Sequence, residues 1–79
     1  MFKGISMTNR EHQIYDAVRE YTAINGYSPT VREIGQDVGL KSTSTVHQYL
    51  NRIMGKGYIT YHPNQPRTLR VLKDIDVFR

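Results

Sequence analysis

The chain has 79 residues, a net charge of +4 and no cysteine. This length suits one compact domain, and the lack of cysteine excludes disulfides, thiolate chemistry and cysteine-based zinc sites. No run of about 18 apolar residues is present, which excludes a membrane-spanning helix. Residues 1–7 also lack the apolar run of a secretory signal, so we expect a cytoplasmic protein.

The charge is distributed unevenly along the chain. Residues 41–73 contain six Lys or Arg residues and no acid, whereas residues 8–40 contain five acids and three arginines. One contiguous basic segment produces a positive field that attracts polyanions. A basic, solvated surface without a partner is the alternative explanation at this point.

The first predicted helix lies between Thr8 and Gly26. Its start has the capping-box pattern, because the Thr8 hydroxyl can accept from the backbone N–H of Glu11 and the Glu11 side chain can reach back. Gly26 suits the left-handed residue that ends a helix. Apolar residues recur at helical spacing between these ends and predict one buried face: Ile14, Ala17, Val18 and Tyr21.

A second, shorter helix is predicted from Thr30 to Gly39. Pro29 precedes it, and Thr30 with Glu33 repeats the capping-box pattern. Two turns of helix are marginal alone, so this helix must pack on the rest of the domain. Its buried face is predicted to consist of Val31, Ile34 and Val38.

The third predicted helix begins after Ser42 and ends at Gly55 and Gly57. Val46, Leu50 and Ile53 form a narrow apolar stripe along it. Only residues 39–41, which include a glycine, separate it from the second helix. Two helices joined by so short a turn are typical of the helix-turn-helix motif.

Two strands are predicted to follow. Residues 58–61 are rich in aromatic and β-branched side chains, and residues 68–72 alternate apolar and polar. Residues 63–66 form the turn between them. We therefore predict a mainly α fold with a small β-hairpin, a three-helix winged helix-turn-helix domain over residues 8–72. Residues 1–7 are then an extension, and residues 73–79 a tail or linker.

The outer face of the third helix indicates the function. With the apolar stripe turned inward, Ser44, Gln48 and Asn51 point directly outward. Short hydroxyls and amides are mediocre choices for helix stability, but they suit the edges of DNA bases. An ordinary polar surface is the alternative. The flanking side chains are Thr45, His47 and Arg52.

Several groups are available for the DNA backbone. The N-terminus of the second helix, from Thr30 to Arg32, offers backbone N–H groups to an anion. The turn from His62 to Arg67 resembles a wing that could lie along a groove, although a plain solvated turn is equally compatible with its residues. The residues assigned to backbone contact are Thr30, Arg32, Lys41, Asn51, Arg52, Lys56 and Arg67.

Other readings have less support. The histidines His12, His47 and His62 lack metal-ligand spacing, and no glycine-rich phosphate loop follows a strand. We therefore expect no cofactor, no metal and no enzymatic activity. We predict that the tyrosines serve packing, with Tyr21 in the core and four others between the helices and the sheet: Tyr27, Tyr49, Tyr58 and Tyr61.

The ordered set of motifs resembles the operator-binding domain of the LexA repressors, in the variant of Gram-positive bacteria. The resemblance runs from about Thr8 to Leu72. It rests on 26–35 (GYSPTVREIG), 38–40 (VGL), 42–50 (STSTVHQYL), 56–59 (KGYI) and 66–67 (PR). It implies a winged domain that represses DNA-damage genes of the SOS response by binding palindromic operators in double-stranded DNA. By position, the family's base-reading residues fall on Ser42, Ser44, Thr45, His47 and Gln48.

The chain also departs from that family. Nothing in it matches the second domain, which dimerises the LexA repressors and cleaves their linker, so we expect no self-cleavage and at most a weak homodimer on DNA. The resemblance leaves open an excised domain or a short stand-alone protein. The rival function is a winged-helix protein-interaction module, for example a phage or mobile-element protein that acts on a host repressor.

Overall fold

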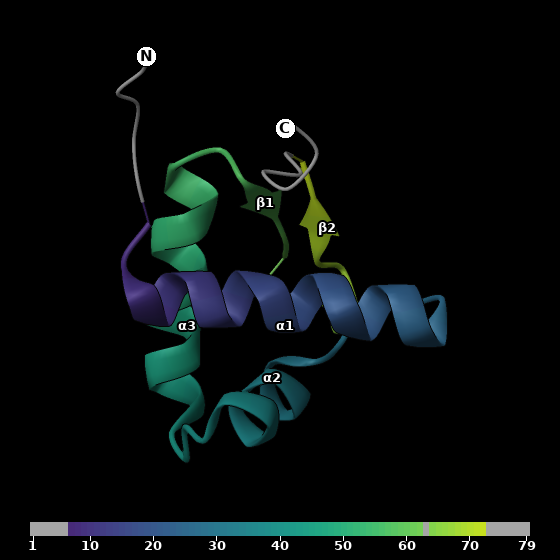
Figure 1. Cartoon of the computed structure of the whole chain (residues 1–79), viewed down its shortest axis with the longest axis horizontal. Helices are drawn as coiled ribbons and strands as arrows, with labels where there is room; N and C mark the ends of the chain where they lie inside the picture. The colour runs from purple at the N-terminus through teal and green to yellow at the C-terminus, as the bar shows by residue number, and fades with distance from the viewer. Residues whose placement is uncertain (1–6, 63, 73–79) are drawn as a thin grey trace.

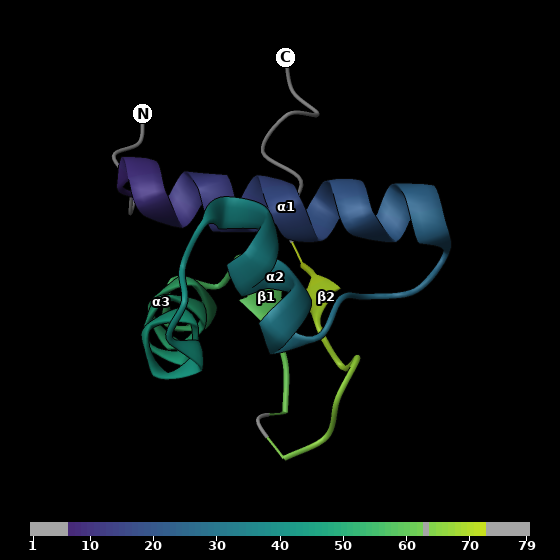
Figure 2. The same ribbon diagram turned by 90° about the horizontal axis from the view of Figure 1, so that it is seen from below.

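The computed structural model describes residues 7–62 and 64–72. Three helices, α1 (Asn9–Asn25), α2 (Val31–Val38) and α3 (Thr43–Gly55), precede a two-stranded antiparallel sheet of β1 (Ile59–Thr60) and β2 (Arg70–Val71). α1 lies across the molecule (Figure 1), and α2, α3 and the sheet lie on one side of it (Figure 2). The predicted class, mainly helical with a small hairpin, is confirmed.

Both predicted capping boxes are present. Thr8 Oγ1 accepts from Glu11 N at 3.2 Å, and Thr8 N donates to Glu11 Oε1 at 3.0 Å. Thr30 and Glu33 repeat these two bonds at 3.2 and 2.9 Å at the start of α2. Each box satisfies two backbone N–H groups at the helix start, which fixes where α1 and α2 begin.

The turn between α2 and α3 requires a close approach at Gly35. Leu40 N donates to Gly35 O at 2.8 Å. A Cβ atom on Gly35 would lie 2.8 Å from the backbone oxygen of Leu40 and 3.4 Å from Val46 Cγ2. Only glycine fits there without a shift of the turn, so Gly35 lets α2 pack closely against α3.

The core contains most of the predicted apolar stripes. Side chains from all three helices and from the hairpin meet in it. The prediction for Tyr21 is wrong, because its ring is only half-buried at the edge of α1. Tyr15 is fully buried instead, with its ring edge-on to Tyr58 at 5.9 Å. The central residues of the core are Ile14, Val18, Ile34, Val46, Leu50, Ile53 and Ile59.

The strands are shorter than predicted. Pairing is limited to Ile59 with Val71 and Thr60 with Arg70. Beyond that point a side chain replaces the ladder, because Thr68 Oγ1 accepts from His62 N at 2.8 Å and so closes the wing. The predicted turn includes Pro63, which lies outside the described residues, as do residues 1–6 and 73–79.

Candidate nucleic-acid interface

The outer face of α3 is exposed as predicted. Val46, Leu50 and Ile53 have no exposed surface, and on the opposite side Ser44, Gln48 and Asn51 are exposed. Two further exposed side chains, Ser42 and Arg52, border this face, while Thr45 and His47 are half-buried. The sequence therefore located the exposed polar face of α3 correctly.

The first turn of α3 differs from those of α1 and α2. Ser42 is its N-cap, and its hydroxyl accepts from Thr45 N at 3.4 Å. No acidic residue stands in this turn, so no carboxylate offsets the positive end of the helix dipole there. That end remains suited to an incoming anion.

His47 is held by Tyr61, the residue between β1 and the wing. Its Nδ1 lies 3.1 Å from Tyr61 Oη, and the two rings are stacked with centroids 6.1 Å apart. Tyr61 Oη in turn donates to Asn51 Oδ1 at 3.2 Å. Burial also raises the pKa of Tyr61, which further favours the protonated hydroxyl. Two predicted site residues of α3 are thus fixed by a tyrosine that the sequence assigned only to packing.

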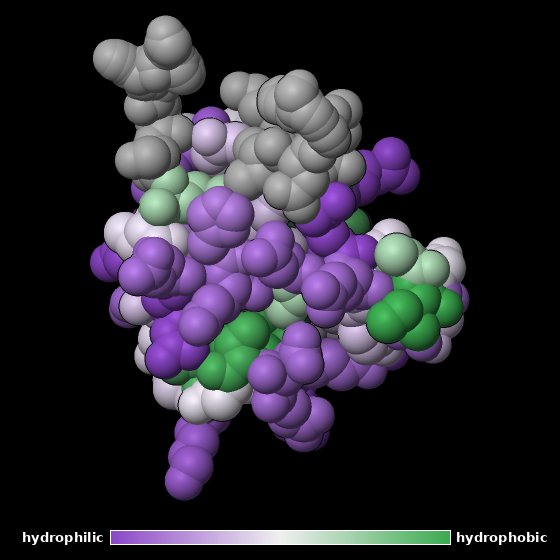
Figure 3. All heavy atoms as spheres, in the orientation of Figure 1, coloured by the Kyte–Doolittle hydropathy of each residue, from purple (hydrophilic) through white to green (hydrophobic). Residues whose placement is uncertain are grey.

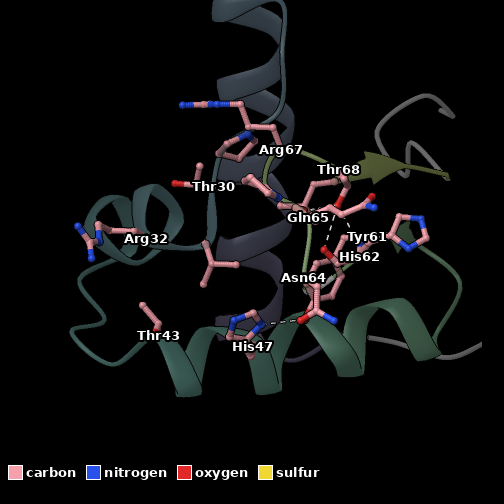
Figure 4. Close-up of a pocket in the computed structure, with 14 residues that line it drawn as sticks. Thr30, Arg32, Thr43, His47, Tyr61, His62, Asn64, Gln65, Arg67 and Thr68 are labelled. Atoms are coloured by element: carbon pink, nitrogen blue, oxygen red, sulfur yellow. Dashed lines mark hydrogen bonds between the residues drawn. The ribbon is translucent and has the colours of Figure 1, made fainter.

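A hollow of about 320 Å³ separates the start of α2, α3 and the wing (Figure 4). Four predicted site residues from three elements meet around it: Thr30, Arg32, His47 and Arg67. Arg32 also lines a second hollow with Lys41 at the α2–α3 turn. The other predicted site residues, which lie along α3 and its ends, do not line the first hollow: Ser42, Ser44, Thr45, Gln48, Asn51, Arg52 and Lys56.

Arg67, predicted to contact phosphate, has partners within the chain. Its guanidinium pairs with Glu33 at 3.2 Å and donates to Ser28 O at 2.9 Å. It also lies over the Tyr27 ring, 4.8 Å from the centroid. The backbone N–H of Thr30, and then Arg67, lower the pKa of Glu33. Arg67 therefore ties the wing to the start of α2, and Tyr27, predicted to be packed, is half-exposed beside it.

Lys56, another predicted phosphate contact, also has a partner within the chain. Its Nζ lies 2.6 Å from Oε1 of Glu11, which is only 2% exposed. Burial raises the pKa of Glu11, but Lys56 and the Thr8 N–H outweigh that effect, so the pKa lies below its usual value. This ion pair joins the start of α1 to the end of α3.

Sequence reasoning missed the partners of these cations. Both glutamates were recognised as capping residues, yet their second partners lie 34 and 45 residues away along the chain. The one available signal was that each capping glutamate needs a counter-charge if its surroundings are buried. Nothing in the local pattern indicates which lysine or arginine supplies it.

Within the described ranges, no three His, Cys, Asp or Glu side chains come together as a metal site. The helices described there are also too short or too polar to cross a membrane. The surface seen in Figure 3 is largely hydrophilic, with an apolar patch over the C-terminal end of α1, where Ile24 is 80% exposed. The exposed face of α3 carries no comparable apolar side chain.

Comparison with known proteins adds a family. A family model described as the LexA DNA-binding domain matches residues 5–68. The chain is similar to the LexA repressor of Staphylococcus aureus (strain Mu3) and to that of Staphylococcus epidermidis (strain RP62A). Identity is 44% over 68 residues in both cases, covering 86% of this chain and 33% of the relative. The chain thus spans about a third of the length of these curated relatives.

Proposed function

The chain belongs to the LexA DNA-binding domain family, and on that premise we propose that it binds double-stranded DNA sequence-specifically, as the operator-binding domain of a LexA-like transcriptional repressor. In this proposal α3 enters the major groove of a palindromic SOS-type operator. The function is one of binding, without a catalytic step, and its place is the cytoplasm.

The observation that carries the proposal is the chemistry of the exposed face of α3. Its side chains end in hydroxyl, amide and imidazole groups, which match the donors and acceptors of base edges in the major groove. An amide such as that of Gln48 can form two hydrogen bonds with adenine. The residues assigned to base reading are Ser42, Ser44, Thr45, His47 and Gln48.

The exposed cations beside this face suit the DNA backbone. Arg32 and Lys41 border the α2–α3 turn, and Arg52 lies on α3 next to Asn51. We propose that the three cations and Asn51 contact phosphate or sugar, together with Thr30 at the start of α2. Lys56 and Arg67 support this surface indirectly, because their charges already pair with the carboxylates of Glu11 and Glu33.

Two copies are expected on one palindrome. Each domain would occupy one half-site, with half-site centres about one helical turn apart or a multiple of it. Most apolar side chains of the helices and the hairpin pack within the domain, so we expect at most weak association of two copies without DNA.

The rival function, protein binding, is favoured by one observation only. Ile24 and Tyr27 are exposed at the end of α1, and an apolar or aromatic anchor is what a protein interface requires. That patch lies away from α3, so the two functions predict different sensitive residues.

The test is selection of duplexes from a randomised pool by the purified chain, followed by titration of the selected duplex and a scrambled one over a salt series. We expect a palindromic consensus and a log–log salt slope of roughly −3 to −4.5, for about three to five phosphates neutralised per domain. Recovery of no consensus, or a slope near zero, would overturn the proposal.

A further inference from the structure

Two hydrogen bonds join His47 to Tyr61 and Tyr61 to Asn51, and their donors and acceptors follow one order. Tyr61 follows β1 directly, whereas His47 and Asn51 are one turn apart on α3. Tyr61 is only 5% exposed, so water competes poorly for its hydroxyl. These two hydrogen bonds therefore connect the buried residue before the wing to the proposed DNA face. Figure 4 shows the contact between His47 and Tyr61.

The direction follows from the number of protons. A tyrosine hydroxyl has one hydrogen to donate, and in this arrangement it goes to Asn51 Oδ1. Tyr61 Oη can then only accept from His47 Nδ1, 3.1 Å away. In a neutral imidazole with its proton on Nδ1, the other nitrogen, Nε2, is an acceptor.

We propose that Tyr61 is a positioning residue for sequence readout: it holds neutral His47 in the Nδ1–H form, so that Nε2 accepts a hydrogen bond from a base. This inference rests on the proposed function and names the base class. Adenine and cytosine present an amino group in the major groove, whereas guanine and thymine present acceptors at the corresponding edges. His47 therefore selects adenine or cytosine at one position of each half-site.

The neighbouring hydroxyls cannot make this distinction. A serine or threonine hydroxyl rotates to donate or to accept, so Ser44 and Thr45 tolerate either kind of base edge. A histidine with a fixed tautomer does not rotate in this way. Because the ring is also stacked on Tyr61, its plane as well as its proton is set before DNA binds.

The first test measures the tautomer in the free protein. Long-range ¹H–¹⁵N spectra of the labelled chain at about pH 8, above the ordinary histidine pKa of about 6.5, distinguish the protonated ring nitrogen. We expect the proton of His47 on Nδ1, with the exposed His62 as an internal reference. A proton on Nε2, or an even mixture, would overturn the inference.

Three variants test the cause. Tyr61→Phe keeps the ring but removes the acceptor, so His47 should lose its tautomer preference. Asn51→Asp offers only acceptor oxygens and should keep His47 in the Nδ1–H form. If instead the Asn51 amide donated to Tyr61 and Tyr61 donated to His47, this substitution would remove the first of those two bonds. Tyr49→Phe removes a hydroxyl elsewhere on α3 and is the matched control, expected to leave the His47 spectrum unchanged.

The DNA test substitutes each position of the selected half-site with all four base pairs. Tyr61→Phe and His47→Ala should both flatten discrimination at the same single position, by about 2- to 10-fold, as expected for one hydrogen bond. If Tyr61→Phe left base-pair discrimination at that position intact, or reduced it at every position of the half-site, this inference would be overturned while the proposed function would stand. Failure of the unmodified chain to discriminate at any position would instead overturn the proposed function.

Discussion

Helices α1 and α2 both begin on a threonine followed three residues later by a glutamate, whereas α3 begins on Ser42 with Thr45 in the place of the glutamate. At the first two starts the carboxylate caps the helix and pairs with a cation from a distant segment, Lys56 or Arg67. At the third start no acid is present.

This difference separates two uses of the same helix-end chemistry. A carboxylate inside the first turn offsets part of the positive end of the dipole within the protein and also joins that helix end to a distant segment. Without it, the positive end remains available to a phosphate or a base acceptor. The basic segment after residue 40 is divided accordingly: two of its cations hold the fold, and others face outward along α3 and the adjoining turn.

The largest expected effect comes from making α3 like the other two helices. Thr45→Glu completes a capping box with Ser42 and should leave thermal stability unchanged or slightly increased. It also places a negative charge where DNA must approach, and like charges at an interface cost several kcal/mol. We expect affinity for the selected duplex to fall at least about 100-fold in a binding titration.

The matched control is Thr45→Gln, which has the same length and also suits a capping box but is neutral. It should lose only the contact made by the threonine, about 10-fold or less. Equal affinity losses for the two variants would mean that charge at the start of α3 is irrelevant to binding.

The next largest effect concerns the joint at the start of α1. Glu11→Gln keeps a side-chain acceptor for Thr8 N but removes the charge paired with Lys56. Because hydrogen bonds to charged groups are the stronger ones, we expect the free energy of unfolding to fall by about 1–3 kcal/mol. Denaturant unfolding measures it, with the exposed Glu20→Gln on the same helix as control, expected within about 0.5 kcal/mol. Equal effects of both variants would contradict the structural role of this pair.

A smaller effect distinguishes the exposed cation Arg52 from Arg67, which is paired within the protein. Arg52→Gln should weaken binding to selected and scrambled DNA alike and reduce the log–log salt slope by about one, as for the loss of one phosphate contact. Arg67→Gln should change the slope less and lower the melting temperature more, since its guanidinium is paired with Glu33. Salt titrations and melting curves of both variants check this, and identical slopes would place Arg67 on the DNA backbone after all.

The dependence of stability on pH is a further consequence. The pKa values of Glu11 and Glu33 lie below the ordinary value of 4.5. Groups with a lowered pKa in the folded state stabilise it above their unfolded value and lose that contribution as the pH falls through the folded one. The free energy of unfolding should therefore decrease as the pH drops below 4.5, and less steeply in Glu11→Gln. A flat profile would show that these carboxylates are not linked to folding.

Much of the fold could be predicted from local patterns. Thr8, Thr30, Gly26 and Gly39 mark helix ends through bonds that span only a few residues, so the sequence locates them directly. The strands were overestimated, because Thr68 closes the wing with its side chain where backbone pairing was expected. Tyr21 was placed in the core because its spacing matched the stripe, although Arg67 holds it at the edge.

The candidate site was predictable where it depends on one helix. Helical periodicity alone turns Gln48 and Ser44 outward. The partners of Lys56, Arg67 and His47 come from segments 14 to 45 residues away, and no periodic pattern encodes such pairing. Local chemistry therefore predicts which residues are exposed, while only the packed structure shows which of them are already engaged.

The most direct test of DNA reading by α3 is the effect of Gln48→Ala on the difference in binding free energy between the selected and the scrambled duplex. Gln48 is exposed and removes no core volume when truncated, so a melting curve should be unchanged. We predict that the difference shrinks by about 1–3 kcal/mol while affinity for scrambled DNA stays nearly constant. An unchanged difference, or an equal loss on both duplexes, would contradict base reading by this face of α3.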